Sequence, residues 1–241
     1  EFTTQKREFK TTTGTYKNKQ FSIISTGIGP DNIDIVMNEL DALVNIDLQT
    51  RKPKEKLTSL NIVRIGTSGS LQADIPVDSY IISSHALDLN GMLHSYQIEE
   101  IANPEIENAF VKHTNWSAKR AAPILIGNHK ELEHKLTSKD TFAGITATAG
   151  GFYGPQGRVL RLNLQDDDLN QKIDSFSYND HRITNLEMET SAIYGLAKLL
   201  GHNACSISAI MANRANGTFS KSPDKLMANL ISYTLEKLVK I

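Results

Sequence analysis

A chain of 241 residues, 39% of them hydrophobic, is long enough to bury one sizeable α/β core, and we expect residues 1–241 to form a single domain. The 26 basic and 27 acidic residues give a formal net charge of −1, so no overall field would attract nucleic acid or an anionic membrane surface. Cys205 is the one cysteine, and the sequence contains neither a signal-like leader nor an apolar run that could span a membrane. These features predict a cytoplasmic protein.

The first predicted elements are a hairpin, a loop and a helix. Phe9–Tyr16 and Gln20–Ser25 are rich in β-forming residues, and Lys17-Asn18-Lys19 joins them as a turn. The stretch Ser25-Thr26-Gly27-Ile28-Gly29 predicts a glycine-containing loop. Apolar residues at helical spacing then predict a helix with one apolar face: Ile33, Val36, Met37, Leu40 and Leu43.

Strands and helices alternate through the rest of the chain. Asn61–Gly66 predicts a strand, and the small residues of Thr67–Ser70 predict a loop after it. Further strands are predicted at Ile75–Ser84, Thr141–Thr148 and His202–Met211, and helices at Pro104–Lys119, at Asn128–Leu136 and after Ser222. This alternation predicts a mainly parallel or mixed sheet with helices on both faces.

Leu164–Tyr178 is polar and contains the run Asp166-Asp167-Asp168. Three adjacent acids could ligate a metal, but on a helix adjacent side chains point in different directions. We therefore expect a solvated helix face here and no metal site.

Two carboxylates flank a methionine in Asn185-Leu186-Glu187-Met188-Glu189-Thr190, where an alternating strand pattern gives way to helical spacing. At such a junction, backbone N–H groups and the helix dipole favour an ionised carboxylate. That carboxylate could accept two hydroxyl hydrogen bonds, as a ribose diol would offer. The alternative interpretation is that these acids only cap the helix.

Two other stretches carry groups suited to an anion and to a flat base. Arg64 precedes Gly66-Thr67-Ser68-Gly69, so a guanidinium, hydroxyls and backbone amides could hold an oxyanion such as phosphate. Phe152-Tyr153-Gly154-Pro155-Gln156-Gly157-Arg158 combines an aromatic ring, an amide and a guanidinium, which could stack on a base and bond its carbonyl and imide edge. A glycine-rich surface loop is the alternative. Together with the carboxylates, these groups predict a site for a nucleoside and phosphate.

The residues described above resemble the nucleoside phosphorylase superfamily, and most closely its uridine phosphorylases. The likeness covers nearly the whole chain. Four motifs carry it, in order: Ser25-Thr26-Gly27-Ile28-Gly29, Arg64-Ile65-Gly66-Thr67-Ser68-Gly69, Phe152-Tyr153 with Gln156 and Arg158, and Glu187-Met188-Glu189. The resemblance implies a three-layer α/β/α sandwich around a mixed, partly barrel-like β-sheet.

The resemblance also implies roles for individual residues. Arg64 and Thr67 would bind phosphate, with Gly66 and Gly69 shaping their surroundings, and Arg7 would reach the phosphate site of a neighbouring subunit. The residues that would bind the nucleoside are Phe152, Gln156, Arg158, Glu187, Met188 and Glu189. Arg158, Gln156 and Glu189 would take the catalytic roles.

The resemblance further implies a homo-oligomer in which a dimer unit assembles into a hexamer. Inorganic phosphate would be a co-substrate, and no metal or organic cofactor would be required. Relatives place a monovalent cation at a dimer interface near the positions of Glu8 and Ile28, for which the sequence itself offers no support.

Some features depart from the family pattern. The opening strand with its Gly-Asp-Pro-x-Arg segment is not found, so we expect an N-terminal strand segment to be missing from this sequence. Asn213 stands where purine-specific relatives have an aspartate that protonates the purine ring, and an amide cannot do this.

We therefore predict phosphorolysis of uridine to uracil and α-ribose 1-phosphate, a step of pyrimidine nucleoside salvage. The alternatives are a purine nucleoside phosphorylase and a non-catalytic nucleoside-binding paralogue.

Overall fold

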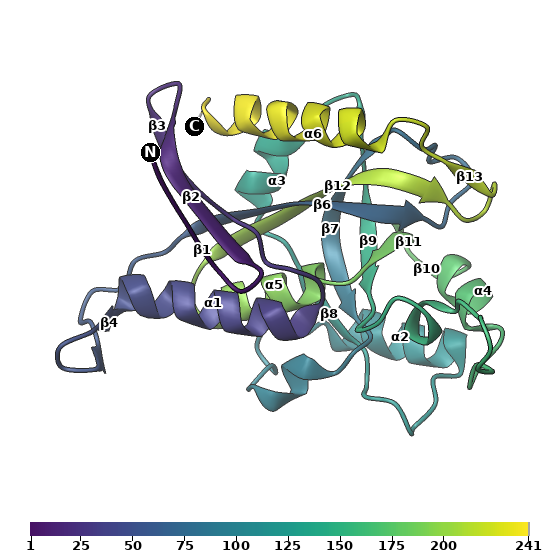
Figure 1. Ribbon diagram of the computed structural model, residues 1–241. Helices are drawn as coiled ribbons and strands as arrows, with labels where there is room; N and C mark the ends of the chain where they lie inside the picture. Colours follow the sequence, from purple (N-terminus) through teal and green to yellow (C-terminus); the bar gives the residue numbers. More distant parts are fainter. Residues whose placement is uncertain (241) are drawn as a thin grey trace.

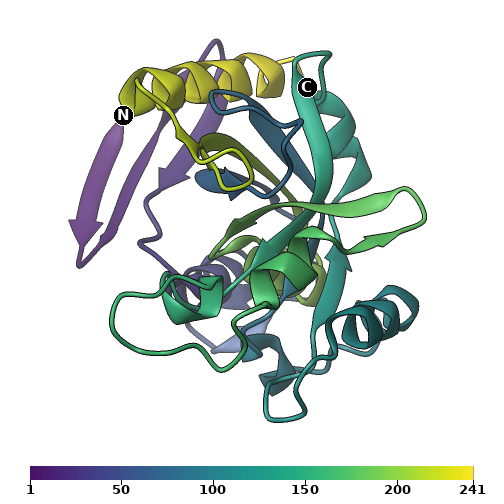
Figure 2. The ribbon, with the colours of Figure 1, turned by 90° about the vertical axis from the view of Figure 1, so that its right-hand side faces the viewer.

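An eight-stranded mixed sheet forms the centre of the molecule (Figures 1 and 2). The computed structural model describes residues 1–240. The strands of the sheet are β6 (Asn61–Ser70), β7 (Tyr80–Asp88), β8 (Ile124–Gly127), β9 (Thr141–Thr148), β10 (Ser177–Tyr178), β11 (His181–Glu187), β12 (Asn203–Asn213) and β13 (Thr218–Phe219). Because β12 pairs with both β6 and β7, the strands β12, β6, β11, β9 and β7 form a closed ring. This ring confirms the predicted mixed, partly barrel-like sheet.

Helices cover the sheet on both sides. Among residues 1–240 they are α1 (Pro30–Asn45), α2 (Pro104–Thr114), α3 (Lys130–Leu136), α4 (Leu169–Asp174), α5 (Thr190–Leu199) and α6 (Pro223–Leu238), with the short 3₁₀ turns η1 (Met92–Ser95) and η2 (Gly154–Gln156). Helices α1 and α5 share one apolar cluster, and α3 and α6 share another on the opposite side of the sheet (Figure 1). The three-layer α/β/α prediction is confirmed. None of the helices in this part of the chain could span a membrane.

Residues of β12 face the two helical layers in turn. Cys205, Ile207 and Ala209 are buried in the cluster that contains Leu226 of α6, whereas Ala204 belongs to the cluster of α1 and α5. Burial raises the pKa of the Cys205 thiol to about 12. The thiol is therefore neutral at pH 7 and packs as a small apolar side chain.

The chain begins with a separate antiparallel sheet, made of β1 (Phe2–Lys6), β2 (Phe9–Tyr16) and β3 (Lys19–Ile24). The β2–β3 hairpin confirms the prediction, but β1 was not predicted, because all of its residues are exposed and no apolar alternation marks it. Tyr16 and Lys17 each donate to Glu236 of α6 at 2.6 Å, which ties the hairpin to the last helix. A smaller hairpin pairs β4 (Ile46–Asp47) with β5 (Lys52–Pro53).

The predicted loop at Thr67–Ser70 is wrong. Strand β6 continues to Ser70, because this segment pairs with β12 from Thr67 opposite Ala209 to Ser70 opposite Asn213. The end of β6 also pairs with β11. Glycine and serine are poor strand formers, so pairing on both sides, and not local propensity, keeps this segment extended.

Other differences concern the ends of elements. Strand β7 starts later than predicted, after Asp78, whose φ of 65° interrupts an extended chain. Helix α2 ends at Thr114, earlier than predicted, because Asn115 adopts a left-handed φ of 48°. Helix α3 starts two residues later than predicted, at Lys130.

The polar segment Leu164–Tyr178 is helical only in α4, so most of the predicted helix is wrong. Leu169 and Ile173 of α4 are buried in the cluster that α2 also joins, so one face of this short helix is packed. Asp166 pairs with Lys172 at 2.9 Å, and this hydrogen bond holds the pKa of the carboxyl below its ordinary value.

Tyr194 fastens α5 to the sheet. Its hydroxyl donates to Ser83 O at 2.7 Å and accepts from Ser206 N–H at 2.8 Å, in a fully buried position. We expect Tyr194→Phe to lower the free energy of unfolding by about 1–3 kcal/mol, because it leaves the buried Ser206 N–H unpaired and leaves Ser83 O with Asn128 Nδ2 as its side-chain donor. Urea unfolding measures the change.

Tyr153→Phe is the control, since Tyr153 is 53% exposed and its substitution should change the same quantity by less than about 0.5 kcal/mol. Equal effects of the two substitutions would contradict this account of Tyr194.

Candidate active site

All but one of the predicted site residues line one open cavity of about 650 Å³. It lies between the second half of β6, the loop after β9 and the junction of β11 with α5. The predicted residues in its lining are Arg64, Gly66, Thr67, Gly69, Phe152, Gln156, Arg158, Glu187, Met188 and Glu189. Arg7 is the exception, because it lies in the turn between β1 and β2 and lines a separate groove of about 570 Å³ beside α1.

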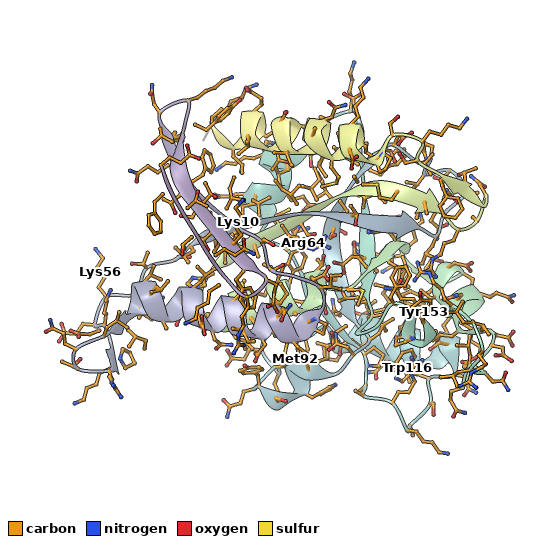
Figure 3. All side chains as sticks on the ribbon, in the orientation of Figure 1. Lys10, Lys56, Arg64, Met92, Trp116 and Tyr153 are labelled. Atoms are coloured by element: carbon orange, nitrogen blue, oxygen red, sulfur yellow. The ribbon has the colours of Figure 1, made fainter. Side chains whose placement is uncertain are left out.

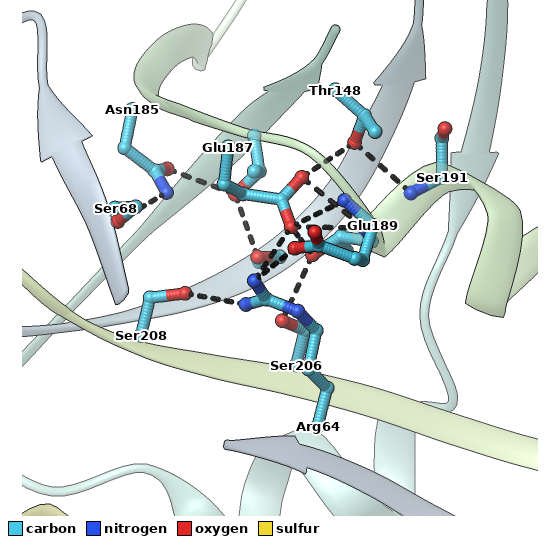
Figure 4. A network of polar contacts seen from close by, with 12 residues as sticks. Arg64, Ser68, Thr148, Asn185, Glu187, Glu189, Ser191, Ser206 and Ser208 are labelled. Carbon is cyan, nitrogen blue, oxygen red and sulfur yellow. Dashed lines mark hydrogen bonds and ion pairs between the residues drawn. The ribbon is translucent and has the colours of Figure 1, made fainter. Parts of the chain in front are cut away.

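Arg64 is the central charged group of the cavity; it lies near the middle of the molecule in Figure 3, and Figure 4 shows its polar contacts. Its Nη2 donates to Glu189 Oε2 at 2.6 Å and lies 3.1 Å from Glu187 Oε2, and its Nη1 donates to Ser208 Oγ at 3.1 Å. Burial by itself lowers the pKa of the guanidinium, but the two carboxylates outweigh burial and raise this pKa above its ordinary value. Arg64 is therefore charged, and three partners fix its direction.

Gly66 and Gly69 have different surroundings. A Cβ added at Gly66 would lie 2.3 Å from Nη1 of Arg64, so only glycine leaves room for the guanidinium. A Cβ added at Gly69 would meet its nearest neighbour at 3.7 Å, an ordinary contact. Gly66 thus shapes the position of Arg64, whereas Gly69 has no such constraint.

Glu187 caps the start of helix α5, so for this acid the alternative interpretation from the sequence, a helix cap, is correct. Its Oε2 accepts from the backbone N–H groups of Glu189 at 3.0 Å and Thr190 at 2.9 Å. Its Oε1 accepts from Thr148 Oγ1 at 2.7 Å. With only 4% of the residue exposed, the carboxylate has little capacity left for a ligand.

Glu189 joins three parts of the chain. Its Oε1 accepts from the backbone N–H of Gly29 at 2.8 Å, and its Oε2 accepts from Arg64. Gly29 has a φ of 94° and directly precedes α1. Because Glu189 lines the cavity and makes no bond to its own helix through its side chain, it is the acid that a ligand can reach.

The loop after β9 folds around a stacked pair. The guanidinium carbon of Arg158 lies 3.8 Å from the centroid of the Phe152 ring, and Nη1 donates to Phe152 O at 2.6 Å. Arg158 Nη1 also donates to Gln156 Oε1. Phe152 is 52% exposed, so the loop presents an aromatic surface and charged donors at the cavity.

Arg214 does not line the cavity but holds Gln156, which does, and the sequence analysis missed this supporting role. Its Nη1 donates to Gln156 O at 2.8 Å and its Nη2 to Gln156 Oε1 at 3.0 Å. Burial, and then repulsion from Arg158, lower the pKa of Arg214 to about 10. Since two arginines donate to Gln156 Oε1, the amide of Gln156 is fixed with its Nε2 as the remaining donor. One feature could have revealed this role in advance. Arg214 directly follows the carboxyl end of β12, which lies beside β6 and runs parallel to it.

Asn213 does not line the cavity. It is buried, and its Nδ2 donates to Gln72 O at 2.8 Å and Ile75 O at 2.7 Å, while its Oδ1 accepts from Asn216 N–H at 2.8 Å. These bonds occupy the amide in holding two loops together.

Comparison with known proteins identifies the family. The profile of the Phosphorylase superfamily matches residues 1–240. The chain belongs to this family. A uridine phosphorylase of Thermococcus kodakarensis is 28% identical over 243 residues, which cover 97% of this chain and 73% of the relative. A DeoD-type purine nucleoside phosphorylase of Listeria monocytogenes is 24% identical over 95% of this chain and 79% of the relative.

Solved structures of phosphorylases share the fold. A Trypanosoma brucei nucleoside phosphorylase that shows uridine phosphorylase activity matches 100% of this chain and 86% of its own, with a TM-score of 0.88 and 26% identity. A uridine phosphorylase of Phytophthora capsici matches 96% of this chain and 80% of its own, with a TM-score of 0.69. At its 21% identity, the second likeness shows the fold alone.

Gly66→Ala should displace the Arg64 guanidinium from its partners. We expect the free energy of unfolding to fall by about 2–4 kcal/mol, because the substitution leaves buried charges unpaired. Gly69→Ala is the matched control and should change the same quantity by less than about 1 kcal/mol. Urea unfolding of both variants measures the difference, and equal stability of the two would show that Arg64 can relax at no cost.

Proposed function

We propose that this chain catalyses the phosphorolysis of uridine to uracil and α-ribose 1-phosphate. The observation that carries the proposal is one cavity lined by the Arg64–Glu189 ion pair on one side and the loop of Phe152, Gln156 and Arg158 on the other. Relatives from the same family are named uridine phosphorylases, at up to 28% identity. In the cell the reaction would serve pyrimidine salvage in the cytoplasm.

In this proposal, phosphate binds on the β6 side of the cavity. Arg64 supplies a fixed charge, and the exposed Thr67 hydroxyl a further donor beside it. Gly66 leaves the space that Arg64 needs. Arg7 of a neighbouring subunit completes the phosphate site, which makes a dimer the smallest active unit. We propose that such dimers assemble into a hexamer.

The nucleoside binds across the rest of the cavity. Its ribose hydroxyls donate to Glu189, while Met188 and Glu187, the acid that caps α5, line the sugar. Its base stacks on the Phe152 side of the cavity and accepts from Arg158 and from Gln156 Nε2 at its carbonyls. The pairing of Gln156 Oε1 with two arginines supports this arrangement, because it leaves Nε2 as the group that can donate to a base oxygen.

The reaction exchanges one bond at the sugar for another. The bond between C1′ and N1 of uracil breaks as the sugar gains oxocarbenium character, and a phosphate oxygen forms the new bond to C1′ from the opposite face. Uracil leaves with the bonding electrons, and Arg158 stabilises the charge that develops on its carbonyls, an effect typically worth ~3 kcal/mol per well-placed donor. Arg64 holds the nucleophile in line. Phosphate is the co-substrate, and the mechanism uses no metal or organic cofactor.

Purine phosphorolysis is the second candidate, because relatives of 24% identity are named purine nucleoside phosphorylases. A purine leaves readily when an acid protonates N7. Asn213, at the position considered for that acid, cannot donate an ionisable proton and does not line the cavity. This observation favours uridine.

Arg158→Ala should lower kcat/KM for uridine phosphorolysis by about two orders of magnitude, because it removes a charged donor to the leaving base. Arg161→Ala is the matched control, since Arg161 is exposed three positions further along the chain, and its rate should stay within about twofold of the unsubstituted protein. Uracil release at saturating phosphate is the measurement. An unchanged rate for Arg158→Ala would place the base elsewhere.

The proposal itself is tested by comparing uridine with inosine at equal concentrations and saturating phosphate. We expect uridine to be preferred by at least about a hundredfold in kcat/KM, because a mismatched base would leave the Nε2 donor of the buried Gln156 without an acceptor. Release of uracil and hypoxanthine is followed in parallel. Comparable rates would favour the purine alternative, and binding of uridine without release of base would favour a non-catalytic nucleoside-binding protein.

A further inference from the structure

The Arg64–Glu189 ion pair joins the two halves of the cavity. Under the proposed function, Arg64 is a phosphate ligand and Glu189 is a ribose ligand, yet in the structure each is the other's partner at 2.6 Å (Figure 4). Their side chains are both only 11% exposed. An ion pair that is so little solvated is screened weakly, so its strength matters to any ligand that must separate it.

Only Glu189 is able to leave this cluster. Glu187 is held by Thr148, by Thr190 and by the backbone at the start of α5, and cannot turn toward a ligand. Glu189 has one other bond, from the N–H of Gly29 at 2.8 Å. Arg64, in contrast, keeps Glu187 and Ser208 as partners when Glu189 moves.

The charges of the cluster make Glu189 an obstacle to an anion. Arg64 contributes one positive charge and its two ion-pair partners, Glu187 and Glu189, contribute two negative charges, so the group has a net charge of −1. An oxyanion that approaches Arg64 meets the Glu189 carboxylate as a competitor for the same Nη2 donor. Ribose hydroxyls are neutral donors and can satisfy Glu189 in place of Arg64.

We propose, on the basis of the proposed function, that this ion pair couples the binding of the two substrates. A bound oxyanion takes the place of Glu189 on Arg64 and releases the carboxylate for the ribose hydroxyls. A bound ribose draws Glu189 from Arg64 and releases the guanidinium for the oxyanion. A ligand that binds alone bears the whole free-energy cost of separating the ion pair. When both ligands bind, the pair is separated only once and this cost is shared. Each ligand therefore strengthens the binding of the other by the same factor.

Calorimetry can measure this coupling without turnover, with sulfate as the oxyanion and sodium chloride at matched ionic strength as the reference. In the unsubstituted protein, saturating sulfate should lower the Kd of uridine about tenfold. Uracil is the control ligand, because it has no ribose and does not reach Glu189. Its Kd should change by less than twofold when sulfate is added.

Glu189→Gln gives the sharper test, because glutamine has the same size and no charge to compete with an anion. Sulfate alone should bind this variant about tenfold more tightly than the unsubstituted protein. This gain would be distinctive, because substitution of a binding residue ordinarily weakens the binding of ligands. The coupling between sulfate and uridine should fall below twofold. Asp74→Asn is the control, since it removes one negative charge from a surface pair with Arg182 and should leave sulfate affinity and coupling unchanged.

The outcomes separate this proposal from the proposed function. If uridine phosphorolysis is observed but sulfate and uridine bind independently, or if Glu189→Gln weakens sulfate binding, the coupling is disproved and the function stands. If coupling is measured but no uracil is released with phosphate, the function is disproved and the coupling stands. If neither ligand binds, both are disproved. The comparison of uridine with uracil decides the matter even if Glu189→Gln does not fold.

Discussion

A buried guanidinium must have partners, and this need organises the structure around Arg64. Separating a buried charge from its partner costs several kcal/mol, so the groups around it are constrained together. Two carboxylates from the β11–α5 junction and one hydroxyl from β12 surround it. Glu189 in turn accepts from Gly29, which fixes the loop before α1. A single charged side chain on β6 thus connects four segments that lie far apart in the sequence.

The two acids beside Met188 have similar sequence surroundings but different tasks. Glu187 is occupied by the start of α5, as in a helix cap, and it holds the helix where the barrel strands end. Glu189 is the N-cap residue of α5, but its side chain makes no capping bond, so it interacts with groups outside the helix. The capping interpretation therefore applies to Glu187, and the ligand interpretation remains a prediction for Glu189.

The sequence predicted the layers of the fold and the members of the cavity because helical and strand periodicities are local, and because the motifs lie at the ends of elements. It did not predict what depends on pairing between distant strands. Thr67–Ser70 has the composition of a loop and is extended only because β12 and β11 flank it. Arg214 is one arginine among many until the parallel pairing of β12 with β6 places it beside Gln156. The polar strand β1 carries no periodicity that could reveal it.

The space left by Gly66 has a consequence for how related sequences are interpreted. An arginine on this strand can be retained while a substitution two positions later pushes it out of the cavity, because a methyl group there would overlap the guanidinium. Such a protein would keep Arg64, Glu187 and Glu189 and still lose the arrangement of this charged cluster. Aligned catalytic residues are thus insufficient grounds for assigning activity to a paralogue. The glycine, which forms no bond through a side chain, is the more informative position to inspect.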